Sequence, residues 1–297
     1  MATILVTGGT GFIGSKLATK LYSLGHQVII TGTESEQTCS FTHFIGNDLQ
    51  SLYDFKQIDY CFHQAAHNDT TDTNEKYMYE SNCLWSKKLF TILKKLNCKK
   101  IVYASSASVY GDLPSPHDEN METKPLNVYA SSKNILEIIA DDFGKKNDIC
   151  MIGLRYFNVY GCNESHKKKR ASMIYQLCSQ ALEHGLCTLF KWGLQTRDWV
   201  SVHDVVNCNL LCLNYSENDI FNVGSGVSVS MNDIVKTIKI YINKNVNINY
   251  IDNPHLDKYQ NNTLANIQKA QIKLKYHPQV NIEDGIKEIL DFKLAKI

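Results

Sequence analysis

A glycine-rich run between a short apolar strand and a helix most restricts the fold of this 297-residue chain. Residues 3–7 are rich in β-branched side chains, which predicts a strand, and a helical pattern and a second strand at 27–30 follow. Gly8 permits a tight turn, Gly11 lets the backbone approach a pyrophosphate, and Gly14 lets helix and strand pack closely. The order strand, glycine loop, helix, strand therefore predicts a dinucleotide-binding site.

The end of the second predicted strand leaves the phosphate state of the dinucleotide open. An NAD site usually offers an acid there for the ribose diol, whereas an NADP site offers a base. Here the strand continues into residues 31–34, with no acid at the usual place and no Lys or Arg before Lys56. Glu34 is still within reach of a ribose, so we expect NAD or NADP without choosing between them.

Strands and helices alternate over the first half of the chain, which predicts an α/β fold with a doubly wound parallel (Rossmann) sheet. Further strands are expected at 41–45, 59–62, 100–104 and 149–155, with helices at 77–96 and 129–143 and a short helix opened by Asp48 and Leu49. Ligands bind such sheets at the carboxyl ends of the strands. Candidate groups at these ends are Gly8–Gly14, His63-Gln64-Ala65-Ala66, Ser105-Ser106 and Asn158.

The alternation loosens after Gly161, where polar loops separate the expected elements. These are helices at 171–183, 203–213 and 231–241 and a strand at 187–190. We predict a dinucleotide-binding domain at 1–161, with 203–222 packing back onto it. Residues 162–202 and 223–297 are expected to form a smaller α/β substrate-binding domain.

Tyr129 and Lys133 stand four residues apart at the start of a predicted helix, so they share one face. A tyrosine hydroxyl has a pKa of ~10, too high for a general base near neutrality, and a nearby ammonium favours the phenolate and lowers that pKa. The pair is a candidate proton-transfer unit. The alternative is an exposed Tyr and Lys on an amphipathic helix, because the pattern is short.

Composition argues against several other classes of protein. A net charge of +1 disfavours a nucleic-acid binder that depends on a basic surface. The ten cysteines include no C-x-x-C pair, and no group of residues has zinc-ligand spacing, so no metal site is expected. The chain opens directly into a strand pattern, and no apolar run approaches the ~20 residues that span a bilayer. We expect a reduced, cytoplasmic protein without a membrane partner.

Six segments together resemble the extended short-chain dehydrogenase/reductases that modify nucleotide sugars, over nearly the whole chain. They are TGGTGFIG at 7–14, YASSASVYG at 103–111, Y-x-x-x-K at 129–133, RYFNVYG at 155–161, RDWV at 197–200 and FNVG at 221–224. Within that group the chain most resembles the ADP-glyceromanno-heptose 6-epimerases, through Thr70-Thr71, KYM at 76–78, KPLNVY at 124–129, His166-Lys167 and Tyr259-Gln260.

The chain departs from that pattern in three places. Cys162-Asn163 replaces the usual Pro-Arg, the segment after the second strand is shortened, and basic residues occupy 168–170. The sugar and the nucleotide of the substrate therefore stay open.

The resemblance implies Tyr129 as the acid/base, with Lys133 holding the nicotinamide ribose and depressing the pKa of the tyrosine. Ser106 would hydrogen-bond the reacting oxygen; the alternative is a strand-end serine that satisfies backbone groups. The implied cofactor-binding set is Gly8, Gly11, Phe12, Ile13, Gly14, Asp48, Leu49, Ala65, Ala66, Asn82, Tyr129 and Lys133.

The substrate residues implied by the resemblance lie mainly in the second half of the chain. Lys167 is expected to serve as a second proton donor on the face of the sugar opposite Tyr129, the alternative being a solvated basic loop. Arg197 would grip the nucleotide pyrophosphate, or else pair with Asp198 at the surface. The full substrate set is Ser106, Asn158, His166, Lys167, Arg197 and Tyr259.

The expected function is an NAD(P)-dependent nucleotide-sugar epimerase that oxidises, turns and re-reduces its sugar, with 6-epimerisation of an ADP-heptose as the specific hypothesis. A UDP-hexose 4-epimerase is the alternative that does not need Lys167. A 4,6-dehydratase is disfavoured because Ala107-Ser108 stands where its acidic pair would be. A non-catalytic dinucleotide-sensing protein is the hypothesis from another class. The helices at 77–96 and 129–143 are expected to form a homo-oligomer interface.

Overall fold

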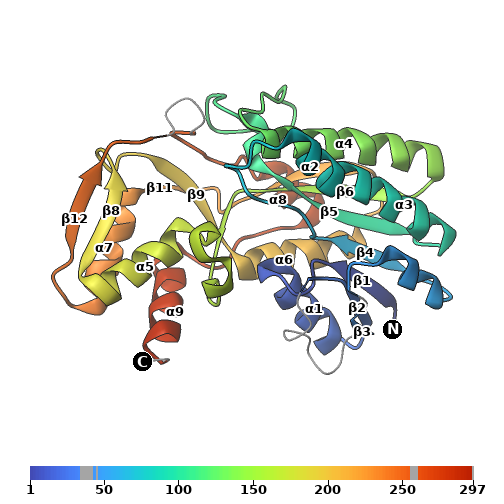
Figure 1. Ribbon diagram of the computed structural model, residues 1–297, viewed down its shortest axis with the longest axis horizontal. Coiled ribbons are helices and arrows are strands. Elements are labelled where there is room, and N and C mark those ends of the chain that lie inside the picture. The colour runs from blue at the N-terminus through green and yellow to red at the C-terminus, as the bar shows by residue number, and fades with distance from the viewer. Residues whose placement is uncertain (34–42, 45, 255–259, 296–297) are drawn as a thin grey trace.

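The computed structural model describes residues 1–33, 43–44, 46–254 and 260–295. A seven-stranded parallel sheet forms the larger part of the molecule, in the order β3-β2-β1-β4-β5-β6-β10 (Figure 1). Its strands are β1 (Thr3–Thr7), β2 (Gln27–Ile30), β3 (His43–Phe44), β4 (Tyr60–His63), β5 (Lys100–Ser106), β6 (Cys150–Tyr156) and β10 (Asp219–Val223). The predicted α/β doubly wound fold is confirmed.

Helices cover both faces of this sheet, which explains why its central strands are almost continuously apolar. On one face, α1 (Phe12–Ser23) and α6 (Val202–Leu211) bury Leu17, Leu21 and Val205 against the sheet. On the other, α3 (Trp85–Lys95) and α4 (Val128–Asn147) bury residues such as Phe90 and Leu136, and Figure 1 shows the two layers on either side of the strands.

The helix predicted at 77–96 is present, but it is not regular. It consists of α2 (Glu75–Tyr79), a π-helical turn (Glu80–Leu84) and α3. Single π turns inside α-helices often lie at functional sites. This turn carries Asn82, whose side chain is almost completely buried.

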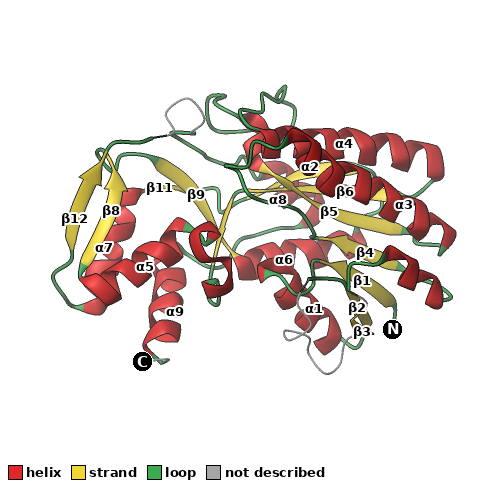
Figure 2. Cartoon of the chain, in the orientation of Figure 1, coloured by secondary structure: helices red, strands yellow, loops and turns green. Residues whose placement is uncertain are grey.

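A second lobe contains two small sheets and three helices, seen at the left of Figure 2. One sheet has the order β11-β9-β7 and the other pairs β12 with β8. The strands are β7 (Asn158–Tyr160), β8 (Leu186–Phe190), β9 (Thr196–Ser201), β11 (Ser228–Ser230) and β12 (Asn247–Ile251), and the helices are α5 (Met173–His184), α7 (Met231–Ile242) and α9 (Ile282–Leu294). The sequence pattern predicted α5, β8 and α7. It did not predict helices α8 (Gln268–Leu274) and α9 or strands β7, β9, β10, β11 and β12.

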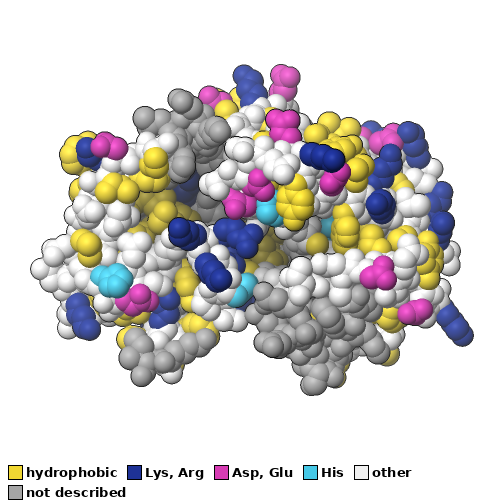
Figure 3. Space-filling view, viewed as in Figure 1, with side chains coloured by type: hydrophobic (Ala, Val, Ile, Leu, Met, Phe, Trp, Pro, Cys, Tyr) yellow, Lys and Arg dark blue, Asp and Glu magenta, His cyan; other side chains and the backbone are white. Residues whose placement is uncertain are grey.

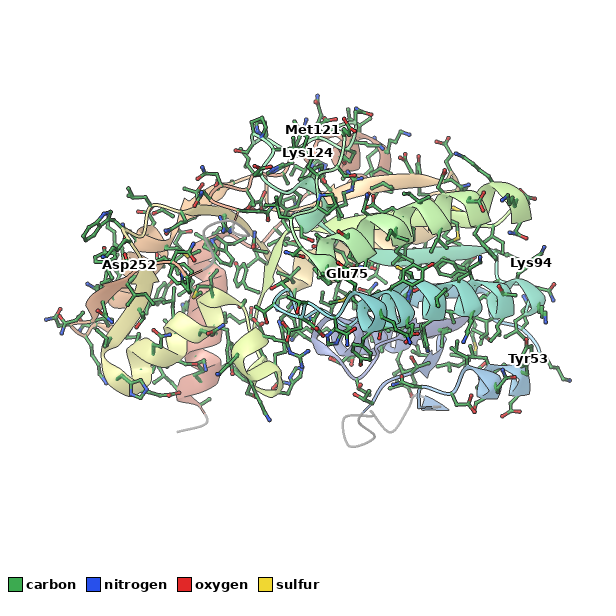
Figure 4. All side chains as sticks on the ribbon, turned by 45° about the horizontal axis from the view of Figure 1, so that its top comes forward. Tyr53, Glu75, Lys94, Met121, Lys124 and Asp252 are labelled. Atoms are coloured by element: carbon green, nitrogen blue, oxygen red, sulfur yellow. The ribbon has the colours of Figure 1, made fainter. Side chains whose placement is uncertain are left out.

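A loop of the sheet lobe is hydrogen-bonded to the chain segment that follows β12. This loop follows the 3-10 turn Ala107–Tyr110 and precedes α4, and Figure 4 shows its Met121 and Lys124 at the top of the molecule. The His117 N–H donates to the Leu264 carbonyl at 2.7 Å, and the Asn266 N–H donates to the His117 carbonyl at 2.8 Å.

None of the helices in the described part of the chain has the length and the apolar character needed to span a membrane.

Candidate active site

The glycine loop has the close approaches that its spacing predicts. Gly8 has φ +64°, and a Cβ there would lie 2.9 Å from the Ala65 backbone nitrogen. A Cβ at Gly14 would overlap the Gly8 carbonyl oxygen. Gly11 is the N-cap of α1 and provides no capping side chain, so the first N–H groups of this helix are left for a ligand.

The loop forms one wall of a cavity of about 700 Å³ that has the properties of a dinucleotide site. Ala65 and Ala66, which follow β4, form a second wall, and the second lobe contributes a third. Among the described residues, the side chains lining the cavity include two cations and no carboxylate. A glycine cradle, a helix N-terminus and a cationic wall fit the two negative charges of a dinucleotide pyrophosphate. The predicted residues in the wall are Gly8, Gly11, Phe12, Ile13, Gly14, Ala65, Ala66, His166 and Lys167.

Five residues of the predicted cofactor set are not in this wall: Asp48, Leu49 and Asn82, and also Tyr129 and Lys133, which lie at the end of β5. Asp48 caps the 3-10 helix Leu49–Asp54 by accepting from the Gln50 N–H at 2.9 Å, Leu49 is buried, and Asn47 is the neighbour that lines the cavity. Asn82 makes its side-chain hydrogen bonds within the protein.

Asn82 joins the segment after β4 to helix α4. Its Oδ1 accepts from the His67 N–H at 2.7 Å, and its Nδ2 donates to the His67 carbonyl and to Ser132 Oγ, both at 2.9 Å. Both Nδ2 hydrogens are used in these bonds, which leaves only the second lone pair of Oδ1 for a cofactor. The geometry therefore makes Asn82 a residue that positions the cavity wall.

Ser106, Tyr129 and Lys133 meet at the carboxyl end of β5. Helix α4 starts at Val128 because Asn127 caps it, accepting from the Ala130 N–H at 2.9 Å. The Lys133 ammonium lies 5.9 Å from the centroid of the Tyr129 ring and donates to the Ala104 carbonyl at 2.8 Å. The interpretation of Tyr129 and Lys133 as an exposed pair is wrong for Lys133, which is 2% exposed.

Burial shifts both pKa values in this group toward the neutral forms. Desolvation raises the pKa of Tyr129 above its usual value, opposed by a hydrogen bond from Ser106. Burial lowers the pKa of Lys133 to about 8. Desolvation is the largest effect on the tyrosine pKa, and the Lys133 ammonium is directed at the Ala104 carbonyl. The expected depression of the tyrosine pKa by Lys133 stays a prediction.

His63 is a buried polar residue of this region, predicted only as one of the candidate groups at a strand end and without a chemical role. Its Nδ1 lies 2.7 Å from Thr7 Oγ1 and its Nε2 lies 2.7 Å from Ser86 Oγ. Burial, reinforced by the charge of Lys133, lowers the pKa of His63 to about 3. The imidazole is neutral at pH 7 and fixes the ends of β1 and β4 to the helix that follows. The sequence signal that could have identified this role is the position of His63 at the end of a predicted strand, in the run HQAA. In the sheet it lies beside Thr7.

Lys167 is neither a solvated loop residue nor an isolated buried amine. It lies in the 3-10 segment Ser165–Arg170, where its ammonium lies 2.6 Å from Glu164 Oε2 and 4.6 Å from the centroid of the Phe12 ring. The Glu164 side chain is completely buried and also accepts from the N–H groups of Gly161 and Ser172. Glu164 was not among the predicted site residues, because nothing in its local sequence shows that it is buried.

Arg197 and Asp198 do not form the surface ion pair considered as an alternative. Both are buried, and adjacent residues of β9 point to opposite faces. The Arg197 guanidinium donates to the carbonyls of Thr196 and Gln260. Asp198 instead accepts from backbone N–H groups, those of Ser225, Gly226 and Ala265.

The remaining predicted substrate residues differ in what the structure describes of them. Asn158 Nδ2 donates to the Asp198 carbonyl at 3.0 Å and to Thr263 Oγ1 at 3.1 Å, tying β7 to its neighbours. His166 is half-buried in the cavity wall. Tyr259 lies outside the described residues.

Comparisons with known proteins agree with this arrangement. A family model described as the NAD dependent epimerase/dehydratase family matches residues 4–224. The ADP-L-glycero-D-manno-heptose-6-epimerase of Brachyspira hyodysenteriae is 33% identical over 308 residues, covering 96% of this chain and 96% of that protein. The structure of the Helicobacter pylori ADP-L-glycero-D-manno-heptose-6-epimerase superposes with a TM-score of 0.89 at 33% identity, covering 99% of this chain and 96% of that one.

A UDP-glucose 4-epimerase has a fold at least as similar. The structure from Thermotoga maritima gives a TM-score of 0.93 at 26% identity and covers 99% of each chain. Family membership thus rests on the family model, on identity over nearly the full length and on the shared fold. The chain belongs to the NAD dependent epimerase/dehydratase family.

Proposed function

We propose that this protein is an NAD(P)-dependent nucleotide-sugar epimerase whose substrate is an ADP-glyceromanno-heptose, inverted at C6 of the sugar. The observation that carries the proposal is the meeting of Ser106, Tyr129 and Lys133 at the carboxyl end of the sheet that also bears the glycine loop. The heptose is supported by 33% identity, over nearly the full length of both chains, to a relative with that activity.

The proposed roles assign the proton chemistry to residues of this chain. Bound NAD(P) would supply the oxidant that takes up a hydride from the sugar carbon and gives it back, which is the chemistry that epimerisation by oxidation and re-reduction needs. Tyr129 takes the proton from the carbinol hydroxyl, and Ser106 holds the same oxygen. Lys133 would hold the ribose of the cofactor, and its charge would stabilise the phenolate form of Tyr129.

Lys167 is proposed as the proton donor from the second lobe, opposite Tyr129. Its ammonium is held by Glu164 against Phe12 of the glycine loop, which supports a role beside the cofactor. Asn158, His166, Arg197 and Tyr259 complete the proposed substrate site, and the cofactor is NAD or NADP. Asn158 and Arg197 act from β7 and β9.

The proposed domain division follows the positions of these groups. Residues 1–161 with 203–222 would hold the dinucleotide, supported by the packing of α6 against α1 and the pairing of β10 with β6. Residues 162–202 and 223–297 would hold the substrate.

A homo-oligomer is also proposed, in the cytoplasm. Its interface would use α2, the π turn and α4, where the large apolar side chains Tyr77, Tyr79, Leu84, Ile135 and Ile138 are exposed. Light scattering on the wild type and on Ile138→Lys tests this, because a charge at an oligomer interface should shift the population toward monomer.

The test of function is incubation of the purified protein with ADP-D-glycero-D-manno-heptose, followed by chromatographic resolution of the two C6 epimers. Interconversion that requires bound nucleotide supports the proposal. Turnover of UDP-glucose to UDP-galactose with an inert heptose substrate would identify a 4-epimerase instead. Chromatography of the nucleotide released on denaturation distinguishes NAD from NADP.

A further inference from the structure

The basic segment Ser165–Arg170 contacts two walls of the glycine-loop cavity, the glycine loop itself and the segment that follows β4. At one end Lys167 lies over the Phe12 ring of the glycine loop. At the other, Arg170 Nη1 donates to Asn68 Oδ1 at 3.3 Å, in the chain segment that follows β4. The segment comes from the second lobe, and Figure 3 shows dark blue Lys and Arg side chains gathered near the middle of the face, between the lobes.

A kink explains why only two of the four consecutive cations reach the cavity. Lys168 has φ +51° and ψ −123°, which breaks the helical path between Lys167 and Arg170. Lys167 and Arg170 line the cavity, whereas Lys168 and Lys169 are exposed and are not part of its wall. The direction of the side chains, and not the basic composition alone, therefore brings charge to the cavity.

The hydrogen bond from Arg170 to Asn68 is weak enough to be replaced by a bond to a phosphate. Its present partner Asn68 is a neutral amide at the surface, and a bond of 3.3 Å at an exposed site is weak. Arg170 is also close enough to Asp69 to help lower the pKa of that carboxyl, after the larger effect of hydrogen bonds from Thr71. A guanidinium binds phosphate oxygens with paired, charge-assisted hydrogen bonds, which are stronger than a bond to an amide.

We propose that Arg170 binds the pyrophosphate of the dinucleotide cofactor from the second lobe, opposite the glycine loop. The inference rests on the proposed function only in requiring that NAD or NADP occupies this cavity. The negative charge of the pyrophosphate is then held between the N-terminus of α1 and the guanidinium. The contact between Arg170 and the phosphate must break before the cofactor dissociates, so this residue slows dissociation.

The experiment compares Arg170→Ala with Lys169→Ala in protein stripped of nucleotide and reloaded with NADH or NADPH. Both variants remove one exposed cation from the same segment, but only the first alters the cavity wall. The protein loaded with reduced nucleotide is mixed with excess oxidised NAD(P), which is not fluorescent, and the release of NADH or NADPH is followed by stopped-flow fluorescence. We expect release about 5- to 20-fold faster for Arg170→Ala, and within about twofold of wild type for Lys169→Ala. The effect should shrink with added salt.

Three results would overturn the inference. Equal acceleration in both variants would mean that net charge alone slows release, and no acceleration in either would remove Arg170 from the cofactor site. A wild-type protein that binds neither NADH nor NADPH would exclude the contact altogether. Nucleotide release is measured without sugar, so it does not depend on epimerisation. If the wild type does not epimerise the sugar but Arg170→Ala releases the nucleotide faster, the proposed function is refuted and this inference still holds.

Discussion

The ammonium of Lys167 lies 2.6 Å from Oε2 of Glu164, a carboxylate with no solvent exposure. Three further groups donate to that carboxylate: the Gly161 N–H, the Ser172 N–H and the Ser172 hydroxyl. Glu164 therefore organises the whole turn between β7 and α5, and it fixes where the cation of Lys167 can be.

Replacing Glu164 by Gln should destabilise the protein. The amide loses the ion pair and turns an NH₂ group toward donors, so we expect a loss of about 2–4 kcal/mol in the free energy of unfolding, measured by urea denaturation. Glu183→Gln is the control, because that side chain is 63% exposed. A change below about 0.5 kcal/mol at Glu164 would show that the buried carboxylate is not a structural centre.

Lys168→Gly should stabilise the protein. Lys168 has φ +51° and ψ −123°, a conformation that glycine adopts without a steric penalty, and its side chain is exposed. We expect a gain of about 1 kcal/mol in urea denaturation, the relief of strain exceeding the higher entropy of glycine in the unfolded chain. The same change at Lys169, which has no such backbone, should give no gain.

Tyr129→Phe should lower kcat about 10²- to 10⁴-fold, because it removes the proposed proton acceptor and leaves the ring. The free energy of unfolding should change by less than about 1 kcal/mol, since Ser106 keeps its contact with Ser108. Resolution of the two C6 epimers gives kcat, and circular dichroism in urea gives stability. Full activity in this variant would exclude Tyr129 from catalysis.

His63→Gln should make the free energy of unfolding depend less on pH below about pH 6.5. The folded-state pKa of about 3 lies below the ordinary histidine value of 6.5, so the unfolded chain binds a proton that the folded protein excludes. The contribution is fully present above pH 6.5 and is lost as the pH falls toward 3, at up to about 1.4 kcal/mol per pH unit. Urea unfolding at pH 7, 6, 5 and 4 measures the slope. Identical slopes in wild type and variant would mean that His63 is protonated when folded.

The sequence predicted the elements whose pattern is local. Strands β1, β4, β5 and β6 are apolar runs, and the glycines before α1 are required by contacts with their near neighbours. Strand β9 was missed because it carries Arg197 and Asp198, which resemble exposed charges. They are buried because partners up to 67 residues away, such as the Ala265 N–H, satisfy them.

The sequence by itself determined the doubly wound fold, the glycine cradle and the four-residue spacing of Tyr129 and Lys133, since these depend on backbone geometry and hydrophobic period. Only the tertiary structure decided the electrostatics. It desolvates Tyr129 and Lys133 and shifts their pKa values toward the neutral forms. It also buries Glu164 beneath Lys167, and brings Arg170 but not Lys169 into the wall of the glycine-loop cavity. Desolvation and the direction of a side chain depend on which distant segments pack together, and no local pattern encodes that.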